Sequence, residues 1–268
     1  MNPRDLPVYQ QKEKILSALE SHRVVVVESP TGSGKTTQLP VILHEAGFSK
    51  NGMIGVTQPR RIAAVSVSQY IANQLEQPFP GLVGYKMRFD DHTSLETRIK
   101  IMTDGILLQE IKNNQALADY SVIMVDEAHE RSLNIDFVLG LLKRAQEMRS
   151  DLHIIVSSAT INAEIFSEYF DHCPVVRIET PMFPVQVIYD DPKVPELPSG
   201  SQSGRELRVQ NALAYDALLD KVAAIVERTV KEKTEGDFLV FLPGEQAIKD
   251  CIIRLYSLSV REKLYILP

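Results

Sequence analysis

The sequence predicts a three-layer α/β fold in which helices cover both faces of a parallel sheet. Short runs of continuous apolar, mostly β-branched residues recur along the chain, as expected for strands that are buried on both faces. Segments with the apolar spacing of helices separate these runs. Regular alternation of strand and helix is the pattern of a layered fold with a mainly parallel sheet.

The expected strands follow one another through the first two thirds of the chain. They are the segments 23–29, 52–58, 98–103, 120–127, 152–160 and 175–179. The helices expected between them are Thr36–Glu45, Arg61–Glu76, Gly105–Asn113, Leu133–Arg149 and Ala163–Phe170. Gly47 follows the first of these helices at a position where glycine commonly ends a helix.

The pattern changes after Pro181, and a second unit is expected to begin there. The stretch 191–204 is rich in Pro, Gly and Ser, which is typical of a loop or linker. A long helix over Asn211–Lys233, a buried strand over 236–244 and a helix over Glu245–Tyr256 are expected next, and 264–268 resembles a further strand. The predicted organisation is a first domain over 1–184, a linker over 185–210 and the start of a second α/β domain over 211–268.

Composition narrows the class of protein. Of 268 residues, 44% are hydrophobic and 24% charged, which is enough apolar material for a buried sheet. The net charge of −6 argues against a surface coated in positive charge, although a local basic track remains compatible with it. No apolar stretch is long enough to span a bilayer, and the first residues lack the core of a signal peptide. We therefore expect a cytoplasmic protein without membrane contact, with Cys173 and Cys251 as reduced thiols.

A glycine-rich segment, Ser29-Pro30-Thr31-Gly32-Ser33-Gly34-Lys35-Thr36, follows the first expected strand and begins the first expected helix. In this context it predicts a phosphate-binding loop, because the two glycines let main-chain N–H groups turn inward toward phosphate oxygens. Lys35 would reach the β- and γ-phosphates of a nucleotide, and the Thr36 hydroxyl would bind Mg²⁺. The strict pattern begins with Gly, so Ser29 fits only if its φ is not positive. The alternative is a turn that caps a helix.

A pair of acidic residues, Asp126 and Glu127, follows the most apolar expected strand. Carboxylates at that end of a parallel sheet lie where α/β folds bind ligands. Asp126 would hold Mg²⁺, and Glu127 would orient or deprotonate the attacking water. Alone, such a pair is often a solvated strand end; together with the phosphate-binding loop it predicts a site that hydrolyses a nucleoside triphosphate.

Asp126-Glu127-Ala128-His129-Glu130-Arg131-Ser132 resembles motif II of the DEAH-box ATP-dependent RNA helicases, most closely their bacterial members. The other family motifs occur in the family's order, and the match runs from about Arg4 to the last residue. They are matched by PTGSGKTTQLP, Thr57-Gln58-Pro59-Arg60-Arg61, Thr103-Asp104-Gly105-Ile106-Leu107-Leu108, Ser158-Ala159-Thr160 and the segment 238–244.

The resemblance implies two RecA-like P-loop domains, the second incomplete here, with ATP–Mg²⁺ bound between them. It implies hydrolysis of ATP coupled to 3′-to-5′ movement on single-stranded RNA, or on DNA. Its catalytic residues would be Lys35, Asp126, Glu127 and His129. Its nucleotide-binding residues would be Thr31, Gly32, Ser33, Gly34, Lys35, Thr36, Thr37 and Tyr70, with Thr36 and Asp126 at the metal.

The same resemblance assigns Thr57, Arg60, Arg61 and Thr103 to the nucleic-acid phosphates. Paired guanidinium groups suit that role, although two arginines at a helix start can also be plain solvated charges. Ser158 and Thr160 would couple the γ-phosphate site to domain movement.

The chain departs from the family pattern in two places. Tyr70 stands where the family commonly has an Arg that stacks on the base, and a tyrosine ring can stack but carries no charge. Motifs V and VI, which carry the arginine finger, would lie beyond Pro268. We therefore expect this chain to bind ATP–Mg²⁺, to hydrolyse it slowly and not to unwind a duplex; a non-catalytic RNA-binding fragment is the alternative.

The segment 84–89 adds two basic residues, Lys86 and Arg88, which could extend a phosphate track. Its aromatic residues, Tyr85 and Phe89, are expected to be core side chains rather than stacking groups.

Overall fold

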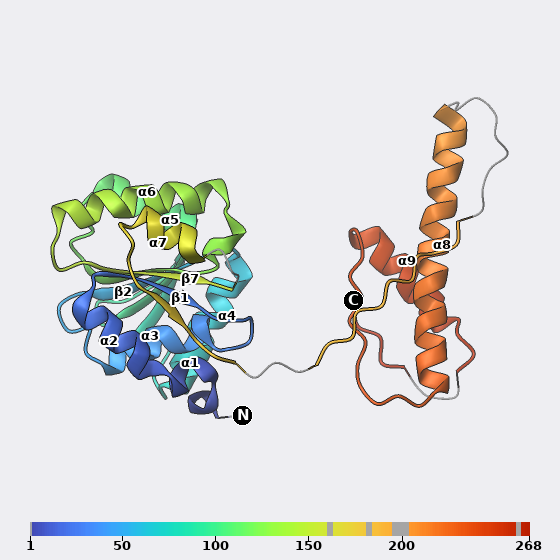
Figure 1. Cartoon of the computed structure of the whole chain (residues 1–268), viewed down its shortest axis with the longest axis horizontal. Helices are drawn as coiled ribbons and strands as arrows, with labels where there is room; N and C mark the ends of the chain where they lie inside the picture. The colour runs from blue at the N-terminus through green and yellow to red at the C-terminus, as the bar shows by residue number, and fades with distance from the viewer. Residues whose placement is uncertain (1, 160–162, 181–183, 195–203, 261–263) are drawn as a thin grey trace. The chain divides into compact units, whose positions relative to one another are not determined.

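The computed structural model describes residues 2–159, 163–180, 184–194, 204–260 and 264–268. The chain divides into two compact units, Met1–Phe183 and Pro184–Pro268, and each is described by itself (Figure 1).

One sheet forms the centre of the first unit. In the described residues it has eight strands in the order β4-β3-β5-β2-β6-β7-β1-β8. Every neighbouring pair is parallel except β3 and β4, which are antiparallel. The strands are β1 (Val24–Glu28), β2 (Met53–Gln58), β3 (Val83–Met87), β4 (Asp90–His92), β5 (Ile99–Thr103), β6 (Tyr120–Val125), β7 (His153–Ser158) and β8 (Val175–Arg177). The six strands expected from the sequence are all present.

Helices cover both faces of the sheet, α1 to α4 on one and α5 to α7 on the other (Figure 1). The α-helices are α1 (Pro7–Gln10), α2 (Lys12–Ser21), α3 (Lys35–Glu45), α4 (Arg61–Gln74), α5 (Asp104–Asn113), α6 (Leu133–Met148) and α7 (Ala163–Tyr169). Short 3₁₀ turns precede α1 (Pro3–Asp5) and α6 (Ala128–Glu130). The predicted three-layer α/β fold is thus confirmed.

Strand β1 shows why its sequence is an unbroken apolar run. Val25 and Val27 pack into the core beneath α2, α3 and α4, whereas Val24 and Val26 pack into the core beneath α5, α6 and α7. Alternate side chains of a strand point to opposite faces, so two buried faces demand an apolar residue at every position. Each such side chain contributes about 1.5–3 kcal/mol when fully buried.

Two features were not predicted. The hairpin of β3 and β4 forms one edge of the sheet, and its outer strand is the polar tripeptide Asp90–His92, which has no apolar run to announce it. Helices α1 and α2 precede the first strand. Ile15 and Leu19, four residues apart, are the buried positions of α2, so the apolar stripe of this helix is narrow.

The second unit contains α8 (Gly204–Lys231) and α9 (Glu245–Tyr256). Arg254 of α9 pairs with Asp216 of α8 at 2.6 Å, and the Tyr215 hydroxyl donates to Asp250 at 2.6 Å. Helix α8 begins at Gly204, inside the stretch 185–210 that was expected to be a linker.

Two strand predictions in the second unit are wrong. The segments 236–244 and 264–268 are not strands. Leu239 and Phe241 are 81% and 86% exposed. A strand needs a neighbour that accepts its main-chain hydrogen bonds, and no other strand exists among the described residues of this unit. In the parts of the chain that the structure covers, no helix is both long and apolar enough to cross a membrane.

Two glycines of the first unit allow a test of its packing. A Cβ at Gly55 in β2 would lie 2.8 Å from Ile123 Cδ1 and 2.9 Å from Tyr120 Cε1. We expect Gly55→Ala to lower the free energy of unfolding by about 1–3 kcal/mol through overpacking. Urea unfolding followed by circular dichroism measures it.

Gly105→Ala is the matched control. A Cβ there meets no atom within 4 Å, and the residue is helical. Alanine should raise stability by up to about 1 kcal/mol, because it restricts the unfolded chain. Equal effects of the two substitutions would contradict the packing described for β2.

Candidate functional site

The predicted site residues lie at the carboxyl edge of the sheet. Strands β1, β2, β5, β6 and β7 run parallel, so the loops that follow them emerge at one edge. Segments that are far apart in the sequence meet there.

The phosphate-binding loop follows β1 and leads into α3. Gly32 and Gly34 have φ of +82° and +94°, a region that favours glycine. Ser29 does not have a positive φ, so the serine at the first position of the pattern fits. The Ser29 N–H donates to the Ser158 carbonyl at 3.1 Å, which ties the loop to the end of β7.

Lys35 is buried at the start of α3. Its ammonium group donates to the main-chain carbonyls of Ser29 and Pro30, at 2.5 and 3.1 Å. Burial lowers the pKa of Lys35, while the negative charges of Asp126 and Glu127 oppose that shift. The two carbonyls hold the ammonium group beside the loop, within the electrostatic influence of the acidic pair.

Asp126 joins three segments. Its Oδ2 accepts hydrogen bonds from the Thr36 hydroxyl at 2.5 Å and from Gln58 Nε2 at 2.6 Å. The residue is 0% exposed, and its Oδ1 has no hydrogen-bond partner among the described residues. The structure thus brings Thr36 and Asp126 together as predicted for a metal site.

Gln58 is a site residue that the sequence analysis did not single out. It is the last residue of β2, which neighbours β6 with Thr57 opposite Val125. The next residues along the two strands, Gln58 and Asp126, therefore lie side by side. The available signal was a polar residue at the end of a buried strand, but its partner depends on the order of strands in the sheet.

Glu127 stands beside Asp126 with φ +52°. Its pKa is raised, first by burial and next by the neighbouring Asp126 carboxylate. Its Oε2 lies 3.3 Å from Nε2 of His129. A non-glycine residue in the left-handed region is uncommon, and such strain concentrates at functional sites.

His129 connects motif II to motif III. Its Nδ1 accepts a hydrogen bond from the Ala159 N–H at 3.2 Å. Ser158, the preceding residue, is fully buried at the end of β7. Thr160 lies outside the described residues. The link between the two motifs therefore runs through the main chain of Ala159.

The residues predicted to bind nucleic acid differ in their exposure to solvent. Arg60 and Arg61 are exposed at the start of α4, and Arg60 pairs with Glu130 at 3.1 Å. Thr103 is half-buried at the end of β5. Thr57 is 0% exposed, so its side chain is not presented to solvent, and its predicted phosphate contact is not available in this structure.

The Thr57 hydroxyl lies near Asp104, although it has no hydrogen-bond partner among the described residues. Burial raises the pKa of the Asp104 carboxyl, and the Thr57 hydroxyl opposes that shift. A threonine at the end of an interior strand is enclosed by its neighbours on both sides, which its own sequence could not indicate.

Tyr70 is 43% exposed on α4, one helical turn before Gln74. The side-chain amides of Gln74 and Gln38 exchange two hydrogen bonds of 2.9 Å, which join α4 to the helix that follows the phosphate-binding loop. This places Tyr70 on the side of α4 that faces α3, and its role at the base stays a prediction.

The two aromatic residues of the segment 84–89 lie in different environments. Tyr85 is 6% exposed and belongs to the core, as expected, but Phe89 is 93% exposed, so its prediction as a core residue is wrong. Phe89 lies in the tight turn between β3 and β4 with φ +66°, where the side chain cannot reach the core.

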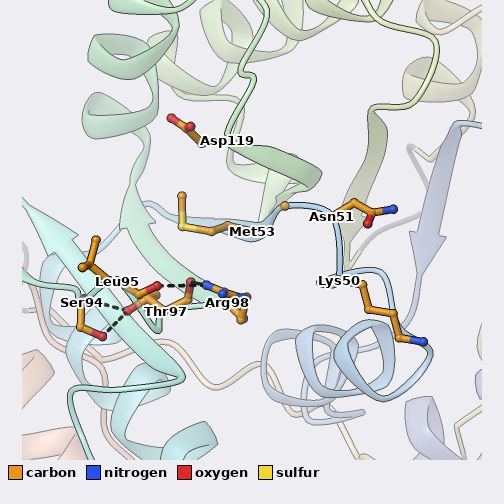
Figure 2. Close-up of a pocket in the computed structure, with 9 residues that line it drawn as sticks. Lys50, Asn51, Met53, Ser94, Leu95, Thr97, Arg98 and Asp119 are labelled. Atoms are coloured by element: carbon orange, nitrogen blue, oxygen red, sulfur yellow. Dashed lines mark hydrogen bonds between the residues drawn. The ribbon is translucent and has the colours of Figure 1, made fainter.

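A cavity of about 410 Å³ lies at the opposite edge of the sheet (Figure 2). It is lined by Lys50, Asn51, Gly52, Met53, Ser94, Leu95, Thr97, Arg98 and Asp119. The Arg98 guanidinium already donates to the carbonyls of Leu95 and Thr97 at 3.2 and 3.0 Å. None of the predicted site residues lines this cavity.

A parallel sheet whose strand ends bring a phosphate-binding loop against a buried aspartate defines a P-loop nucleoside-triphosphatase domain of the RecA-like type. A family model described as "DEAD/DEAH box helicase" matches residues 9–167, which is more than half of the chain. The chain belongs to the DEAD/DEAH box helicase family, whose domain binds ATP.

Three relatives carry the name ATP-dependent RNA helicase HrpA or HrpA homolog. The protein of Borreliella burgdorferi is 50% identical over 268 residues, which are 100% of this chain and 30% of the relative. That of Escherichia coli K12 is 44% identical over 261 residues, 97% of this chain and 19% of the relative. That of Haemophilus influenzae is 47% identical over 249 residues, 92% of this chain and 18% of the relative. The chain spans less than a third of the length of each.

The hydrogen bond from the Ala159 N–H to the His129 imidazole allows a test of the site's geometry. We expect His129→Ala to speed amide hydrogen exchange at Ala159 by about tenfold or more, because the N–H loses its acceptor. The amides of Ile154–Val156 within β7 should keep their exchange rates. Unchanged exchange at Ala159 would show that the imidazole does not hold this N–H.

Proposed function

We propose that this chain is the nucleotide-binding part of an RNA helicase motor, in which hydrolysis of ATP is coupled to 3′-to-5′ movement on single-stranded RNA. The observation that carries this proposal is the junction of Thr36, Gln58 and Asp126. It connects the phosphate-binding loop, the strand that leads to Arg60 and Arg61, and motif II. A change at the nucleotide can therefore reach Arg60 and Arg61, which are proposed to hold the RNA.

The residues at this junction suit Mg²⁺. The metal prefers hard oxygen ligands, and the Thr36 hydroxyl and the Asp126 carboxylate supply them. The buried Oδ1 of Asp126, which has no partner among the described residues, provides a free acceptor there. When bound, Mg²⁺ neutralises charge on the β- and γ-phosphates.

The residues around the junction take the other roles in nucleotide binding and hydrolysis. Lys35 exchanges its carbonyl partners in the loop for the β- and γ-phosphates. Thr31 to Thr37 surround the phosphates with main-chain N–H groups. Glu127 orients or deprotonates the attacking water, and Tyr70 stacks on the base. His129 senses the state of Glu127 and, with Ser158 and Thr160, passes it to motif III.

RNA is the proposed polymer because the relatives' names state it. Arg60, Arg61 and Thr103 hold its phosphates, because they lie accessible at the same edge as the nucleotide site. DNA is the alternative, and contacts to the 2′-hydroxyl would decide between them.

The isolated chain is proposed to bind ATP–Mg²⁺ and to turn it over slowly. The second unit supplies two helices and no strand among its described residues, and the family motif with the arginine finger was not matched in these 268 residues. An arginine finger contributes about 10³–10⁵-fold to hydrolysis in P-loop enzymes. A nucleotide-dependent RNA-binding fragment is thus the second candidate.

The direct test is Mg²⁺-dependent ATP binding and hydrolysis by this chain, with and without single-stranded RNA. Lys35→Ala should lose binding, because no cation remains for the phosphates, whereas Glu127→Gln should bind ATP as well as the wild type. RNA should leave the slow turnover of the wild type nearly unchanged. Fast, RNA-stimulated hydrolysis that Glu127→Gln abolishes would overturn the proposal of slow turnover, and absence of ATP binding would overturn the nucleotide site.

A second test concerns the binding of single-stranded RNA. The double substitution Arg60→Ala and Arg61→Ala should weaken binding of single-stranded RNA and reduce the salt dependence of the binding constant by about 0.7 per lost phosphate contact. Fluorescence anisotropy across a salt series measures both.

Lys112→Ala is the matched control, because this exposed lysine lies at the far end of α5, away from the carboxyl edge. If it reduced the salt dependence as much as the double substitution, Arg60 and Arg61 would have no special role.

A further inference from the structure

The segment before the first strand lies directly on the phosphate-binding loop. The Val8 N–H donates to the Ser33 carbonyl at 3.2 Å. A Cβ built on Gly34 would lie 2.9 Å from Leu6 Cδ1 and 3.1 Å from Leu6 Cβ. The loop therefore has a further partner, and this partner belongs neither to β1 nor to α3.

This N-terminal segment is anchored independently of the loop. The Tyr9 hydroxyl donates to Glu45 at the end of α3 at 2.8 Å, and Arg4 pairs with the same carboxylate at 3.3 Å. Gln11 Nε2 donates to the Glu179 carbonyl at 2.7 Å. Val8 itself is 0% exposed in the core. These contacts hold the segment against the body of the domain, so that it can act as a fixed support.

The hydrogen bond from the Val8 N–H to the Ser33 carbonyl determines the direction in which the Gly34 N–H points. The Ser33 carbonyl and the Gly34 N–H belong to one planar trans peptide, in which they point in opposite directions. Because Val8 holds the carbonyl toward α1, the Gly34 N–H points away from α1. Leu6 packs against Gly34 and leaves little room for this peptide to rotate.

We propose that Leu6 and Val8 are positioning residues for phosphate binding: they hold the peptide between Ser33 and Gly34 with its N–H directed at the phosphates of the nucleotide. The proposal rests on the nucleotide site described under the proposed function. Neither residue touches the phosphates, and both act through the loop. A preset N–H donor spares the cost of ordering the loop when the nucleotide binds.

The test compares Val8→Pro with Val8→Ala. Both replace the valine side chain, but only proline lacks the N–H, and proline is tolerated in the first turn of a helix. We expect Val8→Pro to bind ATP–Mg²⁺ about tenfold or more weakly than Val8→Ala, because a donor to a charged group is no longer preset. Calorimetric titration measures it.

Tripolyphosphate is the second probe, because it has phosphates and no base. Its affinity should fall by the same factor as that of ATP, because the lost donor acts on the phosphates and not on the base. Equal binding of both ligands by the proline and alanine variants would overturn the proposal.

Leu6→Ala keeps the proposal testable if the proline variant does not fold. Leu6 is only half-buried, so its truncation should leave the urea midpoint close to that of the wild type, while ATP and tripolyphosphate bind several-fold more weakly. Leu16→Ala, which truncates another half-buried leucine in α2, is the matched control and should bind both normally.

Equal binding by the two leucine variants would overturn the role of Leu6. Failure of the wild type to bind ATP would instead contradict the proposed function itself, so the two failures are distinguishable.

Discussion

The buried carboxylate of Asp126 is the interaction on which the site depends. A carboxylate that is fully removed from water costs several kcal/mol unless partners satisfy it. Here the Thr36 hydroxyl and the Gln58 amide supply two hydrogen bonds, and the Lys35 ammonium group contributes its field. Lys35 and Thr36 begin the helix that follows β1, and Gln58 ends β2, so satisfying one charge aligns β1, β2 and β6 at their carboxyl ends.

The sheet makes this alignment possible. Its strands are continuous apolar runs with polar residues at their ends, so a slip of one residue would draw a polar end residue into the core. The pairing of Thr57 with Val125 then places the following residues, Gln58 and Asp126, beside each other. In the same way, Glu28 lies opposite Ser158, which brings the phosphate-binding loop and motif III together.

The support of the phosphate-binding loop extends beyond the sheet. Val8 and Leu6 contact the loop from the segment before the first strand, and Glu45 fixes that segment. His129 and Ala159 connect the acidic side to β7. The loop is thus held between a preformed main-chain support and a polar network, and a nucleotide would exchange only a few of these contacts.

The layered fold, the phosphate-binding loop and the acidic pair could be predicted before the structure was known, because they depend on local patterns: continuous apolar runs, glycines in a strand-to-helix turn and carboxylates at a strand end. Ser29 was also judged correctly from the demands of its φ. The tertiary structure decided what depends on neighbours. It gave Asp126 its partner Gln58, enclosed Thr57 beside Asp104 and exposed Phe89 at a hairpin turn. It also left 236–244 without a strand's hydrogen-bond partners, since an apolar run becomes a strand only where another strand lies beside it.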